Sequence, residues 1–363
     1  MSAAGTRMVT VGALAAYPER IDVRSPAEYA EDHLPGAVSE PVLSNDERAL
    51  VGTLHARDSA FAAKRAGAAI VARNVARMLE TSFRDQPRDW TPLVYCWRGG
   101  KRSGALTHVL NEIGWRAVQL EGGYRAYRRH VRAQLETVPA RFDLRVVCGL
   151  TGSGKSRLLQ ALALEGAQVL DLEALAAHRG SLLGDLPDLP QPSQKHFETT
   201  ILDALEQLDG NRPVYVESES KRIGTLQVPD ALLDAMRRAS CVLVDLAPEL
   251  RVALLREEYA HFLDDAETLA RQLAPLTALH GKATIERWDA AARAADWDLL
   301  VSELLALHYD PTYTRSMERN FPRHHEARSV RPQAIDVAHY RELARALIAQ
   351  DIATPSPLVM DPA

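Results

Sequence analysis

Short apolar runs alternate along this chain with longer stretches in which apolar residues recur at helical spacing. Each short run has the length and composition of a buried strand. In the second half the runs are separated by helical stretches, which predicts parallel strands wound with helices. The runs predicted as strands are those ending at Arg24, Leu93–Tyr95, Trp115–Leu120, Leu144–Cys148, Gln168–Asp171, Val214–Glu217 and Val242–Leu246.

Helix starts are marked by capping residues near the beginning of the chain. Ser25 is a good N-cap, Pro26 suits the first helical position, and Glu28 follows three residues after the cap, so a helix should begin there and end before His33. Helical spacing predicts further helices, and it makes the region from Pro248 to Leu307 mainly helical. Two of these helices should lie within Asn45–Leu54 and Ala60–Leu79.

The chain has enough apolar material for two domains, with 363 residues of which 46% are hydrophobic. A boundary is expected near Val138-Pro139-Ala140, which gives domains 1–138 and 139–363. We expect the residues after Thr354 to form a loose tail.

Composition indicates the cellular compartment and the kinds of partner to expect. A formal charge of −5 gives no global basic signature, so any nucleic-acid surface must be local. Three cysteines do not suit a disulfide framework. Residues 1–11 lack the apolar core of a signal peptide, and no apolar run approaches the roughly 20 residues of a membrane span. We therefore expect a cytoplasmic protein without a membrane partner.

The first candidate for chemistry is Cys96, which follows a strand-like run and enters a turn of glycines and cations. Successive backbone N–H groups, the start of the helix that Ser103 opens, and nearby cations all favour negative charge on sulfur. We therefore interpret Cys96 as an activated thiolate and the loop after it as an anion-binding loop. The residues of that loop are Trp97, Arg98, Gly99, Gly100, Lys101 and Arg102.

Cys96 and Arg102 are separated by five residues, a spacing that occurs in two chemistries. Protein-phosphatase loops use it to hold a phosphate, and rhodanese-type loops use it to carry sulfur or selenium on cysteine. The context resembles the rhodanese domain, because Asp22-Val23-Arg24 ends a strand and His33-Leu34-Pro35-Gly36-Ala37 forms a turn ahead of the cysteine. The resemblance favours chalcogen transfer. Asp22 and Arg24 are interpreted as a structural pair that ties the strand end to a loop.

The second candidate is a complete Walker A sequence between a predicted strand and a predicted helix. Its glycines let backbone N–H groups surround phosphate oxygens, Lys155 supplies a positive charge, and the Ser156 hydroxyl can reach a magnesium ion. The expected phosphate-binding residues are Gly149, Thr151, Gly152, Ser153, Gly154, Lys155 and Ser156.

Other residues of the second half are less decisive. Asp245 and Glu217 each end an apolar run, and either could be the acidic partner of the Walker A loop. Cys148 and Cys241 lie inside apolar strands and are interpreted as core thiols.

Two stretches combine basic and aromatic residues, from Tyr124 to Arg132 and from Tyr313 to Arg331. Each is either a solvated helix face or a contact for an RNA backbone. His324-His325 within the second stretch suggests a metal, but no cysteine or carboxylate cluster supports one, so the metal stays unknown. The candidate RNA contacts are Arg125, Arg128, Arg129, Arg132, Arg315, Arg319 and Arg323.

A rhodanese-like half joined in this order to a P-loop half resembles the tRNA 2-selenouridine synthase family. Further stretches look like that family, among them Glu217-Ser218-Glu219-Ser220-Lys221-Arg222-Ile223-Gly224. The resemblance implies an α/β fold: a rhodanese-like domain, then a P-loop NTPase-like domain with a parallel sheet and a largely helical C-terminal part. It also implies a transferase of selenium-containing groups that is a geranyltransferase as well.

The implied reaction replaces sulfur by selenium at the 2-position of the wobble uridine in the tRNAs for lysine, glutamate and glutamine. Geranyl diphosphate first alkylates the sulfur, and selenophosphate then supplies selenium. Cys96 would accept or relay selenium, and the loop after it would hold selenophosphate. The P-loop would bind the diphosphate of geranyl diphosphate or the phosphate of selenophosphate, while nucleotide hydrolysis stays open. No tightly bound cofactor is expected beyond a possible Mg²⁺, and an enzyme that makes selenophosphate is a possible partner.

Three other functions fit parts of the sequence. The first is a sulfurtransferase or sulfur carrier whose P-loop domain binds ATP and regulates it. The second is a ligand sensor, which an activated thiol at Cys96 argues against. The third is a phosphatase with the same Cys96 to Arg102 spacing, which Trp97 and the rhodanese-like context disfavour.

Overall fold

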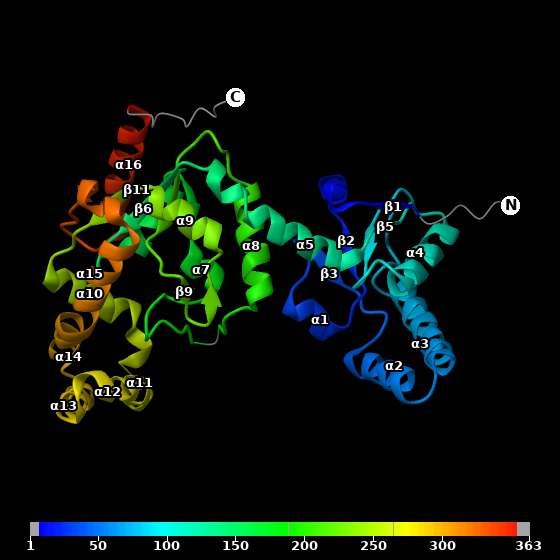
Figure 1. Cartoon of the computed structure of the whole chain (residues 1–363), viewed down its shortest axis with the longest axis horizontal. Helices are drawn as coiled ribbons and strands as arrows, with labels where there is room; N and C mark the ends of the chain where they lie inside the picture. The colour runs from blue at the N-terminus through cyan, green and yellow to red at the C-terminus, as the bar shows by residue number, and fades with distance from the viewer. Residues whose placement is uncertain (1–6, 188, 264, 354–363) are drawn as a thin grey trace. The chain divides into compact units, whose positions relative to one another are not determined.

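The computed structural model describes residues 7–187, 189–263 and 265–353, and the tail expected after Thr354 lies outside them. The chain divides into two compact units (Figure 1). The first unit runs to Gln134 and also includes Ser193–Asp203, and the second contains Leu135–Pro192 and the chain from Ala204 onward. The sequence placed the boundary after Val138, four residues later, and gave no sign that Ser193–Asp203 groups with the first unit.

The first unit is built on a five-stranded sheet in the order β1-β5-β4-β2-β3. All of its paired strands run parallel, so each connection crosses over the sheet. The strand predicted over Trp115–Leu120 is shorter in the structure and begins at Val118. The strands are β1 (Met8–Val9), β2 (Arg20–Asp22), β3 (Ala37–Ser39), β4 (Leu93–Tyr95) and β5 (Val118–Leu120).

The predicted helices of the first unit are confirmed. α1 begins at Pro26, where the Glu28 carboxylate accepts the Ser25 backbone N–H at 3.1 Å, as the capping pattern predicts. Apolar residues of α3 and α4, such as Val75 and Leu106, pack into one core with β4. The helices are η1 (Val11–Ala16), α1 (Pro26–Glu31), α2 (Asn45–Arg57), α3 (Ala60–Glu80), α4 (Lys101–Ile113) and α5 (Gly123–Leu135).

Asp22 and Arg24 form a buried ion pair, as the sequence predicts. Arg24 Nη2 lies 2.6 Å from Asp22 Oδ2 and also donates to the backbone oxygen of Asp32 at 2.6 Å. The guanidinium lies over the ring of Tyr124, 4.0 Å from its centroid. The pair therefore fastens the end of β2 to neighbouring segments and does not face solvent.

The second unit contains a five-stranded parallel sheet in the order β12-β11-β6-β8-β7. Every residue of its central strand β6 is buried, and all of them except Arg145 are apolar; Cys148 and Cys241 are buried free thiols, as predicted. β12 was not predicted from the sequence. The strands of this sheet are β6 (Leu144–Cys148), β7 (Gln168–Leu170), β8 (Val214–Glu217), β11 (Ser240–Val244) and β12 (Arg328–Val330), and β9 (Arg222–Ile223) pairs with β10 (Leu226–Gln227) in a small hairpin.

Helices cover the second sheet and then form a separate helical layer (Figure 1). α6 and α16 pack together on the sheet through Leu158, Leu159 and Leu347. The helices of this unit that connect or flank its strands are η2 (Val138–Arg141), α6 (Lys155–Leu164), α7 (Leu172–Ala176), α9 (Asp230–Arg238) and α16 (Val337–Ala353), whereas α8 (Gln194–Glu206) belongs for most of its length to the first unit. The helical part predicted from Pro248 comprises α10 (Pro248–Glu258), η3 (Ala260–Phe262), α11 (Ala266–Leu273), η4 (Ala274–Leu276), α12 (Thr277–His280), α13 (Lys282–Arg293), α14 (Trp297–Leu304), the π-helical η5 (Leu305–Tyr309), α15 (Asp310–Asn320) and η6 (Pro322–Glu326).

The architecture confirms the predicted fold class, an α/β chain with a rhodanese-like unit followed by a P-loop unit with a helical C-terminal part. Among the residues that the structure describes, no helix is both long and apolar enough to cross a membrane.

Candidate functional site

Cys96 lies directly after β4, and its sulfur accepts two hydrogen bonds. The Gly100 backbone N–H donates at 3.3 Å and the Ser103 hydroxyl at 3.1 Å. Gln119 Nε2 donates to the Ser103 oxygen at 2.8 Å, which leaves the hydroxyl proton free to point at sulfur. Three segments, the turn, α4 and β5, thus combine to hold one sulfur atom.

These contacts decide the ionisation of the thiol. Burial alone raises the pKa of Cys96, but hydrogen bonds from the Ser103 side chain and from the backbone of Ser103, Gly100 and Arg98 outweigh it. The net effect lowers the pKa of Cys96 below its ordinary value. The loop can therefore hold a thiolate, the nucleophilic form of cysteine.

The turn after Cys96 is locked to the beginning of α5. The Tyr124 N–H donates to the Cys96 carbonyl at 2.9 Å, and the Arg125 N–H donates to the Trp97 carbonyl at 3.1 Å. Gly99 has φ of +63°, and a Cβ there would clash with the Leu120 carbonyl oxygen. Only glycine adopts this positive φ readily and also avoids the clash with the carbonyl oxygen. The turn can therefore bring its N–H groups beside the sulfur.

The cations of the loop differ in their surroundings. Arg98 and Lys101 are exposed, whereas Arg102 lies 2.8 Å from Glu28 in an ion pair. Burial raises the pKa of Glu28, but hydrogen bonds and charge from Arg102 lower it to about 2. Arg102 is therefore neutralised by a carboxylate, and the loop offers its backbone N–H groups, Arg98 and Lys101 to an incoming anion.

The Walker A loop joins β6 to α6 in the strand-loop-helix setting that the sequence predicts. Lys155 Nζ donates to the carbonyl oxygens of Gly149 and Leu150 at 3.0 and 3.2 Å. Gly154 has φ of +86°, and a Cβ there would clash with the hydroxyl of Tyr340 on α16. The loop thus has the tight backbone of an anion nest.

The acidic residue that contacts this loop directly is Glu173, whereas the candidates from the sequence were Asp245 and Glu217. The Ser156 hydroxyl donates to Glu173 Oε2 at 3.0 Å, and the Glu173 N–H donates to Glu217 Oε1 at 2.6 Å. Asp245 is instead 58% exposed and pairs with Arg331 at 3.2 Å. Of the two candidates, Glu217 belongs to the hydrogen-bond network of the loop and Asp245 does not.

Glu217 and Glu219 are buried beside Glu173, and this environment changes the pKa of both carboxyl groups. Burial is the main cause that raises the pKa of both well above the ordinary value, and the charge of Glu173 adds to it. Glu217 Oε2 is buried without a hydrogen-bond partner in the described structure. No group of three or more His, Cys, Asp or Glu among the described residues is arranged to hold a metal ion by itself.

A cavity of about 420 Å³ opens at the Walker A loop. Lys155 lies on one side of it, and its Nζ is 6.0 Å from the centroid of the Tyr313 ring. Seven further polar residues of its lining come from α7, α10 and several loops, and the sequence did not assign them to the site. They are Asp171, Glu173, His178, Arg179, Ser181, Glu219 and Glu258.

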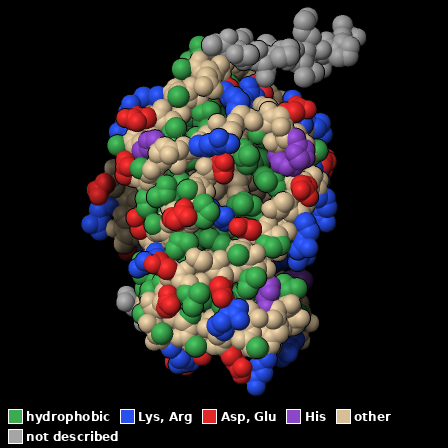
Figure 2. All heavy atoms as spheres, turned by 90° about the vertical axis from the view of Figure 1, so that its left-hand side faces the viewer, with side chains coloured by type: hydrophobic (Ala, Val, Ile, Leu, Met, Phe, Trp, Pro, Cys, Tyr) green, Lys and Arg blue, Asp and Glu red, His purple; other side chains and the backbone are tan. Residues whose placement is uncertain are grey.

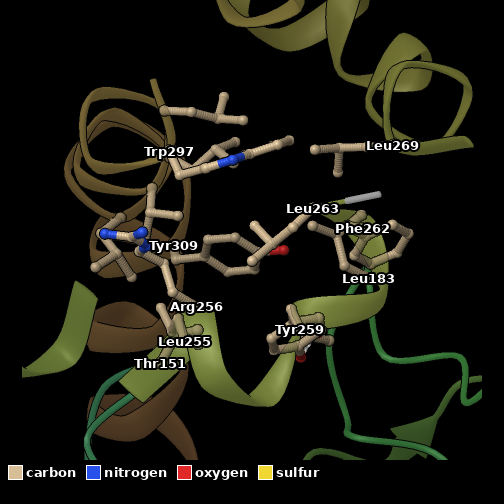
Figure 3. A pocket seen from close by; sticks show the side chains of 15 residues that line it. Thr151, Leu183, Leu255, Arg256, Tyr259, Phe262, Leu263, Leu269, Trp297 and Tyr309 are labelled. Carbon is tan, nitrogen blue, oxygen red and sulfur yellow. Dashed lines mark hydrogen bonds between the residues drawn. The ribbon is translucent and has the colours of Figure 1, made fainter. Parts of the chain in front are cut away.

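A second cavity, of about 70 Å³, lies among the helices that follow β11 (Figure 3). Its walls are almost wholly apolar, with aromatic rings from Tyr259, Phe262, Trp297 and Tyr309. Thr151 of the Walker A loop belongs to its lining. The sequence did not locate this cavity.

The predicted RNA contacts fall into two groups in the structure. On α5, Arg125, Arg129 and Arg132 are exposed and share one helix face because their spacing is four and three residues. Arg128 is on another face, only 14% exposed, and pairs with Glu198. Arg128 therefore has a structural partner that the sequence did not reveal.

The second basic stretch is only partly exposed. Arg315 and Arg319 are exposed on α15, and Arg323 is exposed as well, although it donates to the Arg238 carbonyl at 3.2 Å. Tyr313 lines the Walker A cavity and Phe321 is buried, so the expected aromatic surface is absent among these described residues. On the side of the molecule that Figure 2 shows, basic and acidic side chains are interspersed.

Two comparisons with protein families agree with the division of the chain into a rhodanese-like unit and a P-loop unit. Residues 13–130 match the rhodanese-like domain, and residues 142–280 match the tRNA 2-selenouridine synthase AAA domain.

Curated proteins similar to the chain are tRNA 2-selenouridine synthases. The one from Nitrosomonas europaea is 37% identical over 246 residues, which cover 66% of this chain and 63% of that protein. The one from Bdellovibrio bacteriovorus is 30% identical over 339 residues, or 82% of this chain and 89% of that protein. The one from Sulfurovum sp. is 30% identical over 332 residues, or 84% of this chain and 90% of that protein.

Proposed function

Because the chain belongs to the tRNA 2-selenouridine synthase family, we propose that it converts 2-thiouridine at the wobble position of tRNA into 2-selenouridine through an S-geranyl intermediate. The substrates are the tRNAs for lysine, glutamate and glutamine, geranyl diphosphate and selenophosphate. The observation that supports this most is Cys96, a sulfur held by two donors at the start of an anion-binding turn. An enzyme that makes selenophosphate would supply the selenium donor.

The first step is alkylation of the thiouridine sulfur. A bond forms between sulfur and C1 of the geranyl group, while the C1–O bond breaks and its electron pair leaves with diphosphate. The uridine N3 proton is lost, which keeps the product neutral. The N–H groups of the Walker A loop and Lys155 are the groups that stabilise the departing diphosphate.

The residues present fit a magnesium ion bound together with a phosphate. Mg²⁺ prefers oxygen ligands and is commonly held by one or two carboxylates and substrate phosphates. Ser156 and Glu173, joined by a 3.0 Å hydrogen bond, would hold it, and the unpartnered Glu217 oxygen lies in the same network. Such an ion would supply positive charge next to the diphosphate.

The second step uses Cys96 and selenophosphate. Thiolate attack on selenium would require a two-electron reduction at phosphorus, whereas attack on phosphorus requires no redox change. In the latter, an S–P bond forms, the P–Se bond breaks and hydroselenide leaves; water then releases phosphate and restores the thiol. In this proposal, the exposed side chains of Arg98 and Lys101 and the turn N–H groups hold the phosphoryl oxygens.

Hydroselenide completes the exchange at carbon 2 of the uridine. Selenium adds to that carbon, the C2–S bond breaks, and geranyl thiolate leaves and takes up a proton. The proton brought by hydroselenide returns to N3. Prior alkylation assists because a thioether sulfur departs more readily than a thiocarbonyl sulfur.

The tRNA backbone is proposed to contact the exposed face of α5. Arg125, Arg129 and Arg132 extend along that helix from the turn that holds Cys96. Phosphate contacts of this kind position a nucleic acid without reading its sequence. Arg315 and Arg319 are a second set of candidate contacts.

Lys155→Ala tests the assignment of the first step. The tRNA is incubated with geranyl diphosphate alone and its nucleosides are analysed by mass. Loss of one preorganised charge at the departing group should slow geranylation about 100-fold or more. Selenation of tRNA that already carries the geranyl group should continue.

The matched control is Lys282→Ala, which removes an exposed lysine of α13 from the same unit and should leave both steps unchanged. Geranylation by Lys155→Ala at the wild-type rate would contradict the proposed role of the P-loop.

A further inference from the structure

The apolar cavity and the Walker A cavity are neighbours with a common wall. Four residues line both cavities: Thr151, Ser181, Leu255 and Tyr259. Thr151 belongs to the phosphate-binding loop itself, so one end of the apolar cavity begins at the anion nest. A ligand that occupied both would carry a phosphorylated head and a tail in the apolar space.

The chemistry of the apolar cavity selects the kind of tail. Among its polar groups, the Ser181 and Tyr259 hydroxyls lie 3.2 Å apart and bond each other. The guanidinium of Arg256 pairs with Asp298 at 2.8 Å. A nucleotide base requires hydrogen-bonding groups that read its edges, whereas a hydrocarbon chain requires only apolar contact. The lining therefore suits a hydrocarbon.

The aromatic and aliphatic walls come from several helices. α10 supplies Leu255, α11 supplies Leu269, and α14 supplies Trp297 and Leu300. The π-helical turn η5 supplies Leu305 and Tyr309. Leu269, Leu300 and Leu305 are also buried members of the helical core, so the cavity is part of a packed layer.

The cavity has two distinct ends. In Figure 3, Thr151 and Leu255 lie at one end, and Trp297 and Leu269 lie at the opposite end. Trp297 is only half-buried, whereas Leu269 is buried. A chain that starts at the anion nest would therefore meet the indole of Trp297 as it extends.

We propose that the hydrocarbon chain of the prenyl diphosphate whose diphosphate lies in the Walker A loop runs along the common wall into this apolar cavity, which receives the far end of the chain, and that Trp297 limits the length of that chain. The proposal rests on the proposed function, since it assumes that a prenyl diphosphate is the alkylating substrate. The cavity assignment extends the proposed function by naming residues that determine which prenyl diphosphate is used.

The test compares prenyl diphosphates of five, ten and fifteen carbons as donors to 2-thiouridine tRNA. Trp297→Ala enlarges the far end and should raise kcat/KM for the fifteen-carbon donor, relative to the ten-carbon donor, by about tenfold or more. Val301→Trp fills the cavity from a half-buried position and should shift the preference toward the five-carbon donor by a similar factor.

Leu299→Ala is the matched control, since Leu299 lies on the same helix α14 but is 44% exposed and outside the lining. Its chain-length preference should equal that of the wild type. Binding of inorganic diphosphate, measured by titration calorimetry, should be unchanged in Trp297→Ala and Val301→Trp, which shows that both variants fold and keep the anion nest.

The outcomes separate this proposal from the proposed function. Wild-type protein that prenylates tRNA, together with cavity variants that keep the wild-type chain-length preference, would overturn the cavity assignment alone. Wild-type protein that binds diphosphate but uses no prenyl donor would overturn both. A change of preference in the two opposite directions would support the cavity assignment.

Discussion

At the scale of single residues, the acidity of Cys96 depends more on hydrogen bonds than on the cations that the sequence displays. Arg102 was expected to face the anion, but Glu28 neutralises it. The sulfur is held by the Gly100 N–H and the Ser103 hydroxyl. The sequence predicted a thiolate from the turn and its cations, while the principal side-chain donor to the sulfur, the Ser103 hydroxyl, became evident only from the structure.

Ser103→Ala should make Cys96 less reactive. The change removes a donor that favours the thiolate, so the pKa of Cys96 rises and its reaction with iodoacetamide moves to higher pH. At pH 7 the rate should fall about tenfold, the effect expected for one hydrogen bond to a charged group. Alkylation of the Cys96 peptide is followed by mass analysis across pH.

Thr107→Val is the control, because its hydroxyl bonds the Ser103 carbonyl one turn along α4 and not the sulfur. An unchanged alkylation profile in Ser103→Ala would refute the part assigned to the hydroxyl.

Gln119 shows why some site residues were missed. It lies inside the strand Val118–Leu120 and orients the Ser103 hydroxyl from there. One polar residue between apolar neighbours is the only signal in the sequence, and such a residue can equally point to solvent. Glu173 and Glu219 were missed for a related reason, since their proximity to Lys155 arises from the parallel winding of β7 and β8 around β6.

At the scale of elements, α5 joins the cysteine turn to an exposed basic face. Its first residues bond the turn through the Cys96 and Trp97 carbonyls, and three exposed arginines follow on one side. A helix fixed in this way can position a polyanion relative to the sulfur.

Replacing Arg125, Arg129 and Arg132 together by alanine should weaken tRNA binding and reduce its dependence on salt. Each phosphate contact contributes a slope of roughly 0.7 to 0.9 to the plot of log affinity against log salt concentration. The slope should therefore become shallower by about 2 to 3. Filter binding at several salt concentrations provides the measurement.

A control with the same loss of charge is Arg65, Arg73 and Arg77 to alanine, which are exposed on α3 of the same unit. Equal slopes for the two triple variants would contradict a specific role of α5.

Elements with strong periodicity or caps were predicted well, and short ones were not. α1, α2 and α3 are found where their patterns placed them. β12 is only three residues long, Arg328–Val330, and its composition resembles a loop. It becomes a strand because it pairs with β11, and such a long-range partner is not visible in a local pattern.

At the scale of the whole molecule, the compact units are not continuous segments of the chain. Ser193–Asp203 belongs to the first unit, where Thr199 and Tyr124 donate to the buried carboxylate of Asp32 at 3.0 and 2.7 Å. Residues more than 160 positions apart thus satisfy one buried charge. No local signal in the sequence could predict this association.

The two proposed chemistries belong to different units. Cys96 lies in the first unit, and the Walker A loop with its neighbouring apolar cavity lies in the second. Geranylation and selenation should therefore be separable by single substitutions, with the geranylated tRNA as the species passed from one step to the other.

The most direct test of this account is nucleoside mass analysis of 2-thiouridine tRNA incubated with geranyl diphosphate and selenophosphate, using the wild type and Cys96→Ser. The wild type should yield 2-selenouridine, and Cys96→Ser should accumulate S-geranyl-2-thiouridine because only the second step requires the thiolate. Selenouridine formed by Cys96→Ser at the wild-type rate, or thiouridine left unchanged by the wild type, would contradict the account.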